Sequence, residues 1–255
     1  MAPPPADVIY NRAPKATPEF WLAKLMAVTV GQSAFSLIAH DLGAGLTLTS
    51  AIVTIFLIFA LIVQFRQKRY VPWIYRATVV LVSVTGTLVA GLVVKHLGYS
   101  LSFAITLFGL SLLVVISGWY ITEKTLSTHQ IVTTRREAYY WVAIFLTFAL
   151  GASAGDQLIR DYGLGYLAAG TAYGLLIGVI AAGFRIGFIG GVPAFWLAYI
   201  LTRPTGAFFE KWLSFPSKDG GLGLGAEPTS LGFFMVMAGL VIYMTSTHHG
   251  LEKAA

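Results

Sequence analysis

The stretch LTLTSAIVTIFLIFALIV, residues 46–63, is apolar along almost its whole length and contains no charged side chain. As a helix rising ~1.5 Å per residue, a stretch of this length spans most of the ~30 Å hydrocarbon core of a bilayer. The whole chain has the same bias, because 56% of its 255 residues are hydrophobic and only 11% are charged. Ordinary soluble domains carry about 25% charged residues. We therefore expect an all-α membrane protein whose main partner is the lipid bilayer.

Seven further apolar stretches resemble this one, so eight transmembrane helices are predicted. They cover residues 20–39, 46–63, 75–94, 101–121, 139–159, 164–183, 192–213 and 229–247. Very short turns join the first six spans in pairs, and such turns favour antiparallel helical hairpins. Arg203 and Pro204 interrupt the seventh span, where we expect a broken helix.

The cations divide unequally between the two sides of the predicted membrane domain. Of the 17 Lys and Arg, 12 are assigned to the side of the N-terminal tail and the even-numbered loops, including Lys24 and Arg76 near the starts of their spans. The other five, on the opposite side or within the membrane, are Lys95, Arg160, Arg203, Lys211 and Lys218. Because cytoplasmic loops are enriched in Lys and Arg, both termini are predicted to be cytoplasmic. Residues 1–19 lack a signal-peptide pattern, and we predict that they form a cytoplasmic tail. A single transmembrane domain is predicted over residues 20–255.

Trp and Gly recur at matched places in the odd-numbered spans. The tryptophans are Trp21, Trp73, Trp141 and Trp196, and the glycines that follow them are Gly31, Gly86, Gly151 and Gly206. Successive glycines are 55, 65 and 55 residues apart, so the two halves of the chain are offset by 120 residues. This self-similarity predicts four tandem two-helix repeats, at 20–69, 70–127, 135–190 and 191–248. Each repeat crosses the membrane twice, so the predicted pseudo-symmetry axis lies along the membrane normal.

Five longer motifs accompany these repeats. They are YVPWIY (70–75), RREAYYW (135–141), FALGASAGDQL (148–158), AFWLAYILTRPTGA (194–207) and DGGLGLG (219–225). With these motifs the chain resembles a bacterial membrane-protein family of four tandem Trp-bearing two-span repeats, catalogued as a repeat of unknown function. The resemblance implies location in the bacterial inner membrane.

The resemblance also implies an acidic residue five positions after each span glycine, with another beside the first glycine. The five-on positions in this chain hold Ser36, Gly91, Asp156 and Lys211, and Gln32 stands beside Gly31. Only the third repeat keeps the carboxylate, although Glu210 lies one residue from the position in the fourth. A cation site made of four carboxylates is therefore not expected here.

Charged and polar residues within the spans are the candidate site. Charges buried in a membrane are costly and often functional, which selects Asp156, Arg203 and Glu210. The alternatives are that Asp156 is an interfacial residue and that Arg203 is a structural clamp between the fifth and seventh spans. Gln32 and Ser36 would line a polar path or join helices by hydrogen bonds. We expect Asp156 and Arg203 to share a polar cavity in the outer half of the bundle.

Other chemistry has little support in the sequence. His40 and His96 lie at matching outer ends of the first and third spans and are weak candidates for a metal or haem site. No cofactor is assigned, and the chain has no Cys for thiolate ligands. No nucleotide-binding or catalytic motif is present, so we do not expect an enzyme. The net charge of +6 lies in short loops and does not indicate nucleic-acid binding.

Two functions remain open on the sequence. The first is a transporter or channel-like protein for a small polar solute or cation, supported by the repeats and the charges within the spans. The second is a non-transporting structural subunit of a larger membrane complex, supported by the missing carboxylates. Homo-oligomers or membrane-complex partners are compatible with both.

Overall fold

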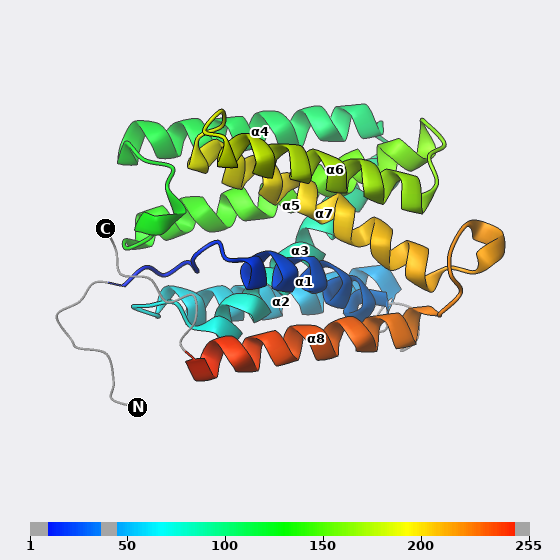
Figure 1. Ribbon diagram of the computed structural model, residues 1–255, viewed down its shortest axis with the longest axis horizontal. Coiled ribbons are helices and arrows are strands. Elements are labelled where there is room, and N and C mark those ends of the chain that lie inside the picture. Colours follow the sequence, from blue (N-terminus) through cyan, green and yellow to red (C-terminus); the bar gives the residue numbers. More distant parts are fainter. Residues whose placement is uncertain (1–9, 37–44, 248–255) are drawn as a thin grey trace.

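The computed structural model describes residues 10–36 and 45–247, without the side chains of 32–36, 45–47 and 219. Within these residues the chain forms eight α-helices and no β-strand, as the sequence predicts, and the helices run along the long axis of the molecule (Figure 1). They are α1 (Pro18–Ser36), α2 (Gly45–Phe65), α3 (Pro72–Gly91), α4 (Leu101–Glu123), α5 (Thr134–Arg160), α6 (Tyr166–Arg185), α7 (Gly191–Ser214) and α8 (Ala226–Thr247). A π-helical segment, η2 (Leu92–His96), extends α3, and η3 (Thr128–Gln130) and η4 (Ser217–Asp219) are short 3₁₀ turns.

Six described helices are long and apolar enough to cross a membrane. These segments are Leu48–Phe65, Pro72–His96, Leu101–Glu123, Thr134–Arg160, Tyr166–Arg185 and Ala226–Thr247. They coincide with six of the eight predicted spans to within a few residues at most ends. The two helices outside this set are α1 and α7, and α7 contains Arg203, Glu210 and Lys211.

The odd-numbered helices form a closed inner ring. Helix α1 packs against α3 and α7, and α5 packs against the same two neighbours. Thus α5 lies across the ring from α1, and α7 lies across it from α3. The even-numbered helices cover the outside: α2 packs on α3, α4 on α5, α6 on α7 and α8 on α1.

This pairing corrects the predicted hairpins. Among the described residues, the helices predicted to pair (α1 with α2, α3 with α4, α5 with α6) pack against each other far less than each even-numbered helix packs against the next odd-numbered one. A turn decides only which helix ends meet, whereas close packing depends on the facing side chains. On α6, for example, a Cβ built at Gly170 would lie 3.2 Å from the Cβ of Phe208 on α7. Small residues thus set the tight contact with the following helix.

The two layers differ in what they expose. Half of the apolar window of α3 and of α5 is buried, against 17–22% for α2, α4, α6 and α8. The outer helices expose large apolar side chains such as Phe59, Val114, Leu175 and Ile242. Exposed apolar surface on this scale is costly in water and is the surface expected to face lipid.

The repeat glycines lie where the inner helices touch. A Cβ built at Gly31, Gly86, Gly151 or Gly206 would lie 3.2 Å from the carbonyl oxygen of Val80, Phe145, Ile200 or Leu25, respectively. In every case that carbonyl belongs to the residue six positions before the next repeat glycine, and the fourth contact returns to α1. Because glycine has no side chain, it lets the two backbones approach this closely.

Helix α7 is not broken, contrary to the sequence-based expectation. It continues from Gly191 to Ser214 with Pro204 in its interior. Proline removes one backbone N–H and leaves the carbonyl four residues earlier without its helical donor. That carbonyl is Ile200 O, the group that faces Gly151 on α5. Helix α5 therefore covers the carbonyl that Pro204 leaves without a helical donor, and α7 continues past the proline.

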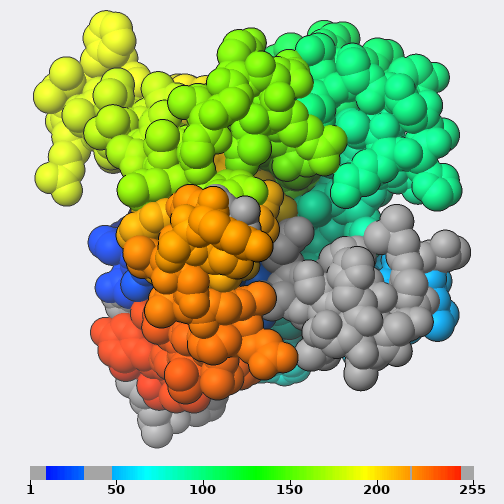
Figure 2. Space-filling view, turned by 90° about the vertical axis from the view of Figure 1, so that its right-hand side faces the viewer, coloured from blue at the N-terminus to red at the C-terminus, as the bar shows by residue number. Residues whose placement is uncertain are grey.

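One end of the bundle is tied by the segment before α1. The Asn11 side chain donates to Thr128 O at 2.6 Å and accepts from the backbone N–H of Ile131 at 2.9 Å. The backbone carbonyl of Asn11 accepts a hydrogen bond from the backbone N–H of Tyr70 at 2.9 Å. The N-terminal segment and the loops after α2 and α4 thus meet at one end. The opposite end faces the viewer in Figure 2, where the orange segment between α7 and α8 lies between α6 and α8.

Candidate functional site

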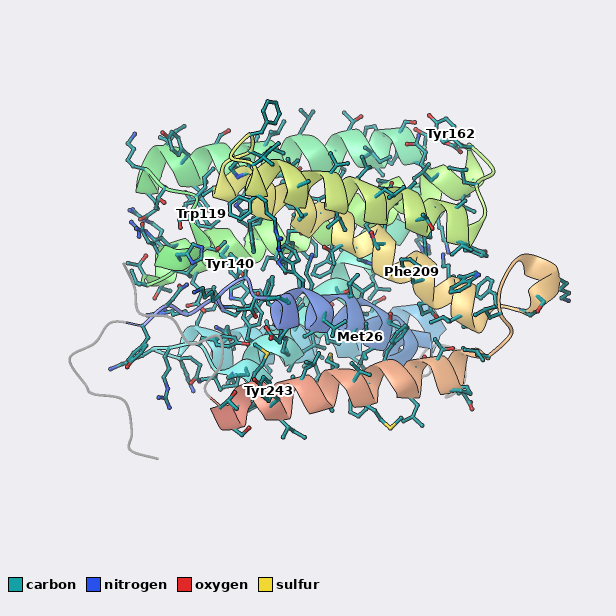
Figure 3. The ribbon with its side chains drawn as sticks, in the orientation of Figure 1. Met26, Trp119, Tyr140, Tyr162, Phe209 and Tyr243 are labelled. Carbon is teal, nitrogen blue, oxygen red and sulfur yellow. The ribbon has the colours of Figure 1, made fainter. Side chains whose placement is uncertain are left out.

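Four aromatic residues close the ring at the end tied by Asn11. Each lies eleven positions before a repeat glycine: Phe20, Tyr75, Tyr140 and Phe195. All four are buried. The hydroxyls of Tyr75 and Tyr140 are 2.6 Å apart and share a hydrogen bond, and the rings of Phe20 and Phe195 stack with centroids 6.1 Å apart. We call this end of the ring interior the inner level. In Figure 3 Tyr140 lies in the left half of the molecule and Phe209, next to Glu210, in the right half.

Arg76 belongs to this inner level, although the sequence places it among the cations of the cytoplasmic side. It lies in the second turn of α3, ten residues before Gly86, where the other three repeats have Trp. Arg76 is only 1% exposed, while Trp73 is 57% exposed. The Arg76 guanidinium carbon lies 5.0 Å from the Phe20 ring centroid, and Nη1 donates to Phe20 O at 3.4 Å. Its Nε and Nη2 have no hydrogen-bond partner among the described residues.

Lys24 is the second buried cation of the inner level. It is 1% exposed, and its Nζ donates to the carbonyl oxygen of Tyr199 at 2.5 Å. The same nitrogen lies 3.2 Å from the Tyr199 ring centroid, 5.5 Å from that of Phe148 and 6.0 Å from that of Trp21. Since Phe148 is on α5, across the ring from α1, Lys24 reaches over the ring axis. Aromatic faces attract a cation but carry no net charge to neutralise it.

Neither inner-level cation has a carboxylate partner. In the part of the chain that the structure describes, no ion pair within 4 Å involves Lys24 or Arg76. The charges that act on Lys24 are those of Arg76 and Arg203, which have the same sign. Glu137, the nearby acid on α5, is bound instead by Arg12 at 2.8 Å and by Gln64 at 2.9 Å. The inner level therefore holds two buried basic side chains without a carboxylate counter-ion among the described residues.

Arg203 occupies the next level of the ring interior, toward the other end. It is 3% exposed, and its Nη2 donates to Thr87 Oγ1 at 2.6 Å, from α7 to α3 across the ring. Asp156 and Glu210 are close enough for their charges to act on Arg203. Glu210 is buried and accepts a hydrogen bond from Ser214 Oγ at 3.3 Å. We call this group the outer level; its cation has acidic neighbours.

The structure thus brings together three of the predicted site residues, Asp156, Arg203 and Glu210. The side chains of Gln32 and Ser36 lie outside the described residues, as does His40. His96 is exposed, and no group of three or more His, Cys, Asp or Glu that could hold a metal occurs in the described ranges.

Sequence reasoning missed Lys24 and Arg76, because cations near helix ends were counted as cytoplasmic. Their register was the available signal: they lie seven and ten residues before Gly31 and Gly86, inside the repeat unit.

A cavity of about 560 Å³ opens beside the ring at the inner-level end. Ile177, Ile180 and Phe184 of α6 line it on one side, and Lys15 and His129 also border it. Its lining comes largely from α6, the start of α7 and the loop after α4. It borders the inner level through Phe195 and Trp21, but neither Lys24 nor Arg76 lines it.

Together, the apolar outer layer and the inner ring define a multi-pass α-helical membrane protein. Two segments of the chain, residues 139–185 and 194–249, match the family model described as Repeat of Unknown Function (DUF347). Both matches begin twelve residues before a repeat glycine, Gly151 or Gly206, and they correspond to the third and fourth predicted repeats. Comparison with curated proteins gives no match, and comparison with solved structures gives none.

Proposed function

We propose that the chain crosses the bacterial inner membrane eight times, as four copies of one two-helix repeat around an axis along the membrane normal. The equivalent contacts of the four repeat glycines support this proposal, because each joins one odd-numbered helix to the next in the same register. The shared register of the two family matches also supports it. The surplus of cations in the even-numbered loops favours cytoplasmic termini.

Reporter fusions test this topology. A fusion after Ser127 is expected to report the cytoplasm, and one after Lys218 the opposite side. A finding that both positions are labelled from outside the cell would contradict the eight-span arrangement.

Within this architecture, we propose that the protein is a transporter or channel-like protein for a small polar solute or ion, rather than an enzyme. One observation carries the proposal: buried basic side chains from α1 and α7 each reach across a closed ring of helices. Lys24 approaches Phe148, and Arg203 binds Thr87, each on the helix across the ring. Intramembrane cations are expensive and commonly mark solute pathways.

Flux measurements test the transport proposal. The full-length chain in proteoliposomes is expected to pass a solute that empty liposomes retain, measured by stopped-flow light scattering. The Thr87→Val variant removes the acceptor of Arg203 and should change the flux severalfold. Thr106→Val is the matched control, because Thr106 is exposed on α4 and binds only Ser102 O of its own helix. Equal rates in protein-containing and empty liposomes would overturn the proposal.

The alternative is a non-transporting structural subunit of a larger membrane complex. The observation that favours it is that the same side chains act as ties, since Arg203 joins α7 to α3 across the ring and Lys24 joins α1 to its neighbour α7. This reading predicts no flux and stable co-purification with partner subunits in mild detergent.

A further inference from the structure

We propose that the inner level is a binding site for a small oxyanion, such as a carboxylate, held by Arg76 and Lys24. This inference rests on the proposed function, because it names the solute class for the same axis. It replaces the cation that the sequence left open with a solute of opposite charge.

The free donors of Arg76 select an oxyanion. Its Nη1 is used by Phe20 O, whereas Nε and Nη2 have no partner among the described residues. These two atoms form one edge of the planar guanidinium, and their N–H groups point in parallel. Such an edge matches the two oxygens of a carboxylate or a similar oxyanion, and a halide would satisfy only one donor well.

A third donor lies beside this edge. The Tyr70 hydroxyl is buried and lies in contact with the Arg76 guanidinium, although no hydrogen bond of good geometry joins the two groups. Burial raises the pKa of Tyr70, so the group stays protonated near neutral pH and can donate. The hydroxyl therefore suits an acceptor ligand.

Charge balance gives the second argument. Lys24 and Arg76 are each 1% exposed, lie within range of each other's charge, and have no carboxylate partner in the described residues. Buried charges are usually paired, because an unpaired one loses its hydration without compensation. One monovalent oxyanion between them would halve the net charge of the inner level.

The approach to the site also favours an anion. The tail and the loop after α2 carry Lys15, Arg66, Lys68 and Arg69 at the same end of the bundle, in addition to Arg12, which is paired with Glu137. A mouth of one charge sign concentrates ions of the opposite sign. Asn11 is fully buried at this end and joins the tail to the loops after α2 and α4.

Thermal unfolding of the purified full-length protein tests the site directly. Sodium formate or sodium nitrate is exchanged for sodium gluconate, a bulkier anion, at constant ionic strength. Because a ligand that binds only the folded state stabilises it in proportion to the logarithm of its concentration above Kd, the Tm is expected to rise by a few degrees. Chloride should give a smaller rise at equal concentration.

Two variants and one control locate the effect. Arg76→Gln is expected to abolish the formate-dependent rise in Tm. Arg76→Lys keeps the positive charge but loses the two parallel N–H donors, so it is expected to abolish the preference for formate over chloride. Lys68→Gln removes an exposed cation from the adjacent loop and should leave the rise unchanged. A wild-type Tm independent of formate and nitrate, or an equal rise in Arg76→Gln, would overturn the inference.

Flux separates this inference from the proposed function. Movement of potassium or a neutral solute, with a formate-independent Tm, would refute the oxyanion site and leave transport standing. A formate-dependent Tm that requires Arg76, without flux of any solute, would support the site and refute transport.

Discussion

The inner and outer levels of the ring both contain buried cations, but they differ in whether acidic side chains lie near those cations. At the outer level, the buried cation Arg203 has a Thr87 acceptor and the charges of Asp156 and Glu210 nearby. At the inner level, Lys24 and Arg76 have aromatic rings and backbone carbonyls but no carboxylate. In repeat register Lys24 and Arg203 differ by four residues, which is about 6 Å along a helix. Two adjacent layers of the same ring thus differ in whether their charge is compensated by the chain itself.

The difference indicates which layer is structural and which awaits a ligand. A cation with its own acids is stable without help, and its removal leaves those acids unpaired. A buried cation without a nearby carboxylate destabilises the folded state unless an anion binds beside it. The two layers should therefore respond to charge removal with opposite signs.

The largest effect is expected at the outer level. Arg203→Gln removes the buried guanidinium that binds Thr87 and that the charges of Asp156 and Glu210 stabilise, and we expect a loss of about 1–3 kcal/mol in the free energy of unfolding. Adding Glu210→Gln should restore part of the loss. Arg160→Gln, which removes an exposed cation from α5, is the control. Denaturant titration in detergent measures all three variants, and equal losses for Arg203→Gln and Arg160→Gln would contradict the assignment.

Closure of the ring that carries both levels comes second. A Cβ at Gly86 would lie 2.9 Å from Phe148 Cβ and 3.2 Å from Phe145 O, so Gly86→Ala should cost about 1–3 kcal/mol by overpacking. Gly91→Ala, on the same helix, meets no atom within 4 Å and should be neutral or slightly stabilising. If the two substitutions shift the Tm equally, the glycine contacts do not hold the ring together.

The inner level should give a smaller effect of the opposite sign. Lys24→Met in gluconate buffer removes an uncompensated buried charge and keeps most of the side-chain volume. We expect a stability within about 1 kcal/mol of the wild type or above it. Lys68→Met serves as the exposed control. A loss as large as that of Arg203→Gln would show that Lys24 is a structural tie, and the comparison between the levels would fail.

The smallest effect is expected at His96. Its side chain is exposed at the end of η2, so His96→Ala should change stability by no more than about 0.5 kcal/mol. Zinc titration should leave the Tm of wild type and variant equally unchanged. A zinc-dependent Tm that requires His96 would revive the metal site considered from the sequence.

Much of the architecture was predictable because its signals are local. Apolar run length located the helices, and the spacing of Gly31, Gly86, Gly151 and Gly206 identified positions that the structure places at equivalent helix contacts. Helix pairing was not predictable from turn length, since α2, α4, α6 and α8 pack mainly on helices of the neighbouring repeat. The predicted break at Pro204 was wrong for a related reason. Whether a proline breaks a helix depends on what packs against the carbonyl that loses its helical donor, and the sequence does not show this.

The candidate site was only half predictable. Arg203, Asp156 and Glu210 stood out because they interrupt an apolar run or lie deep within a span. Lys24 and Arg76 lie one or two turns from a helix start, where a long cationic side chain ordinarily reaches water. Their burial depends on Phe20, Tyr199 and Phe148 from three helices, and no local pattern contains that information.

Selenate, an oxyanion with strong anomalous scattering, tests the uncompensated inner level most directly. Crystals of the full-length protein grown with selenate are expected to show an anomalous peak beside Nε and Nη2 of Arg76, on the side facing Lys24. The Arg76→Gln variant should lose that peak while any peaks at exposed cations such as Lys68 remain. A map with peaks only at surface cations, or with Arg76 turned onto a carboxylate of the chain, would contradict the proposal that this layer takes its counter-charge from a bound anion.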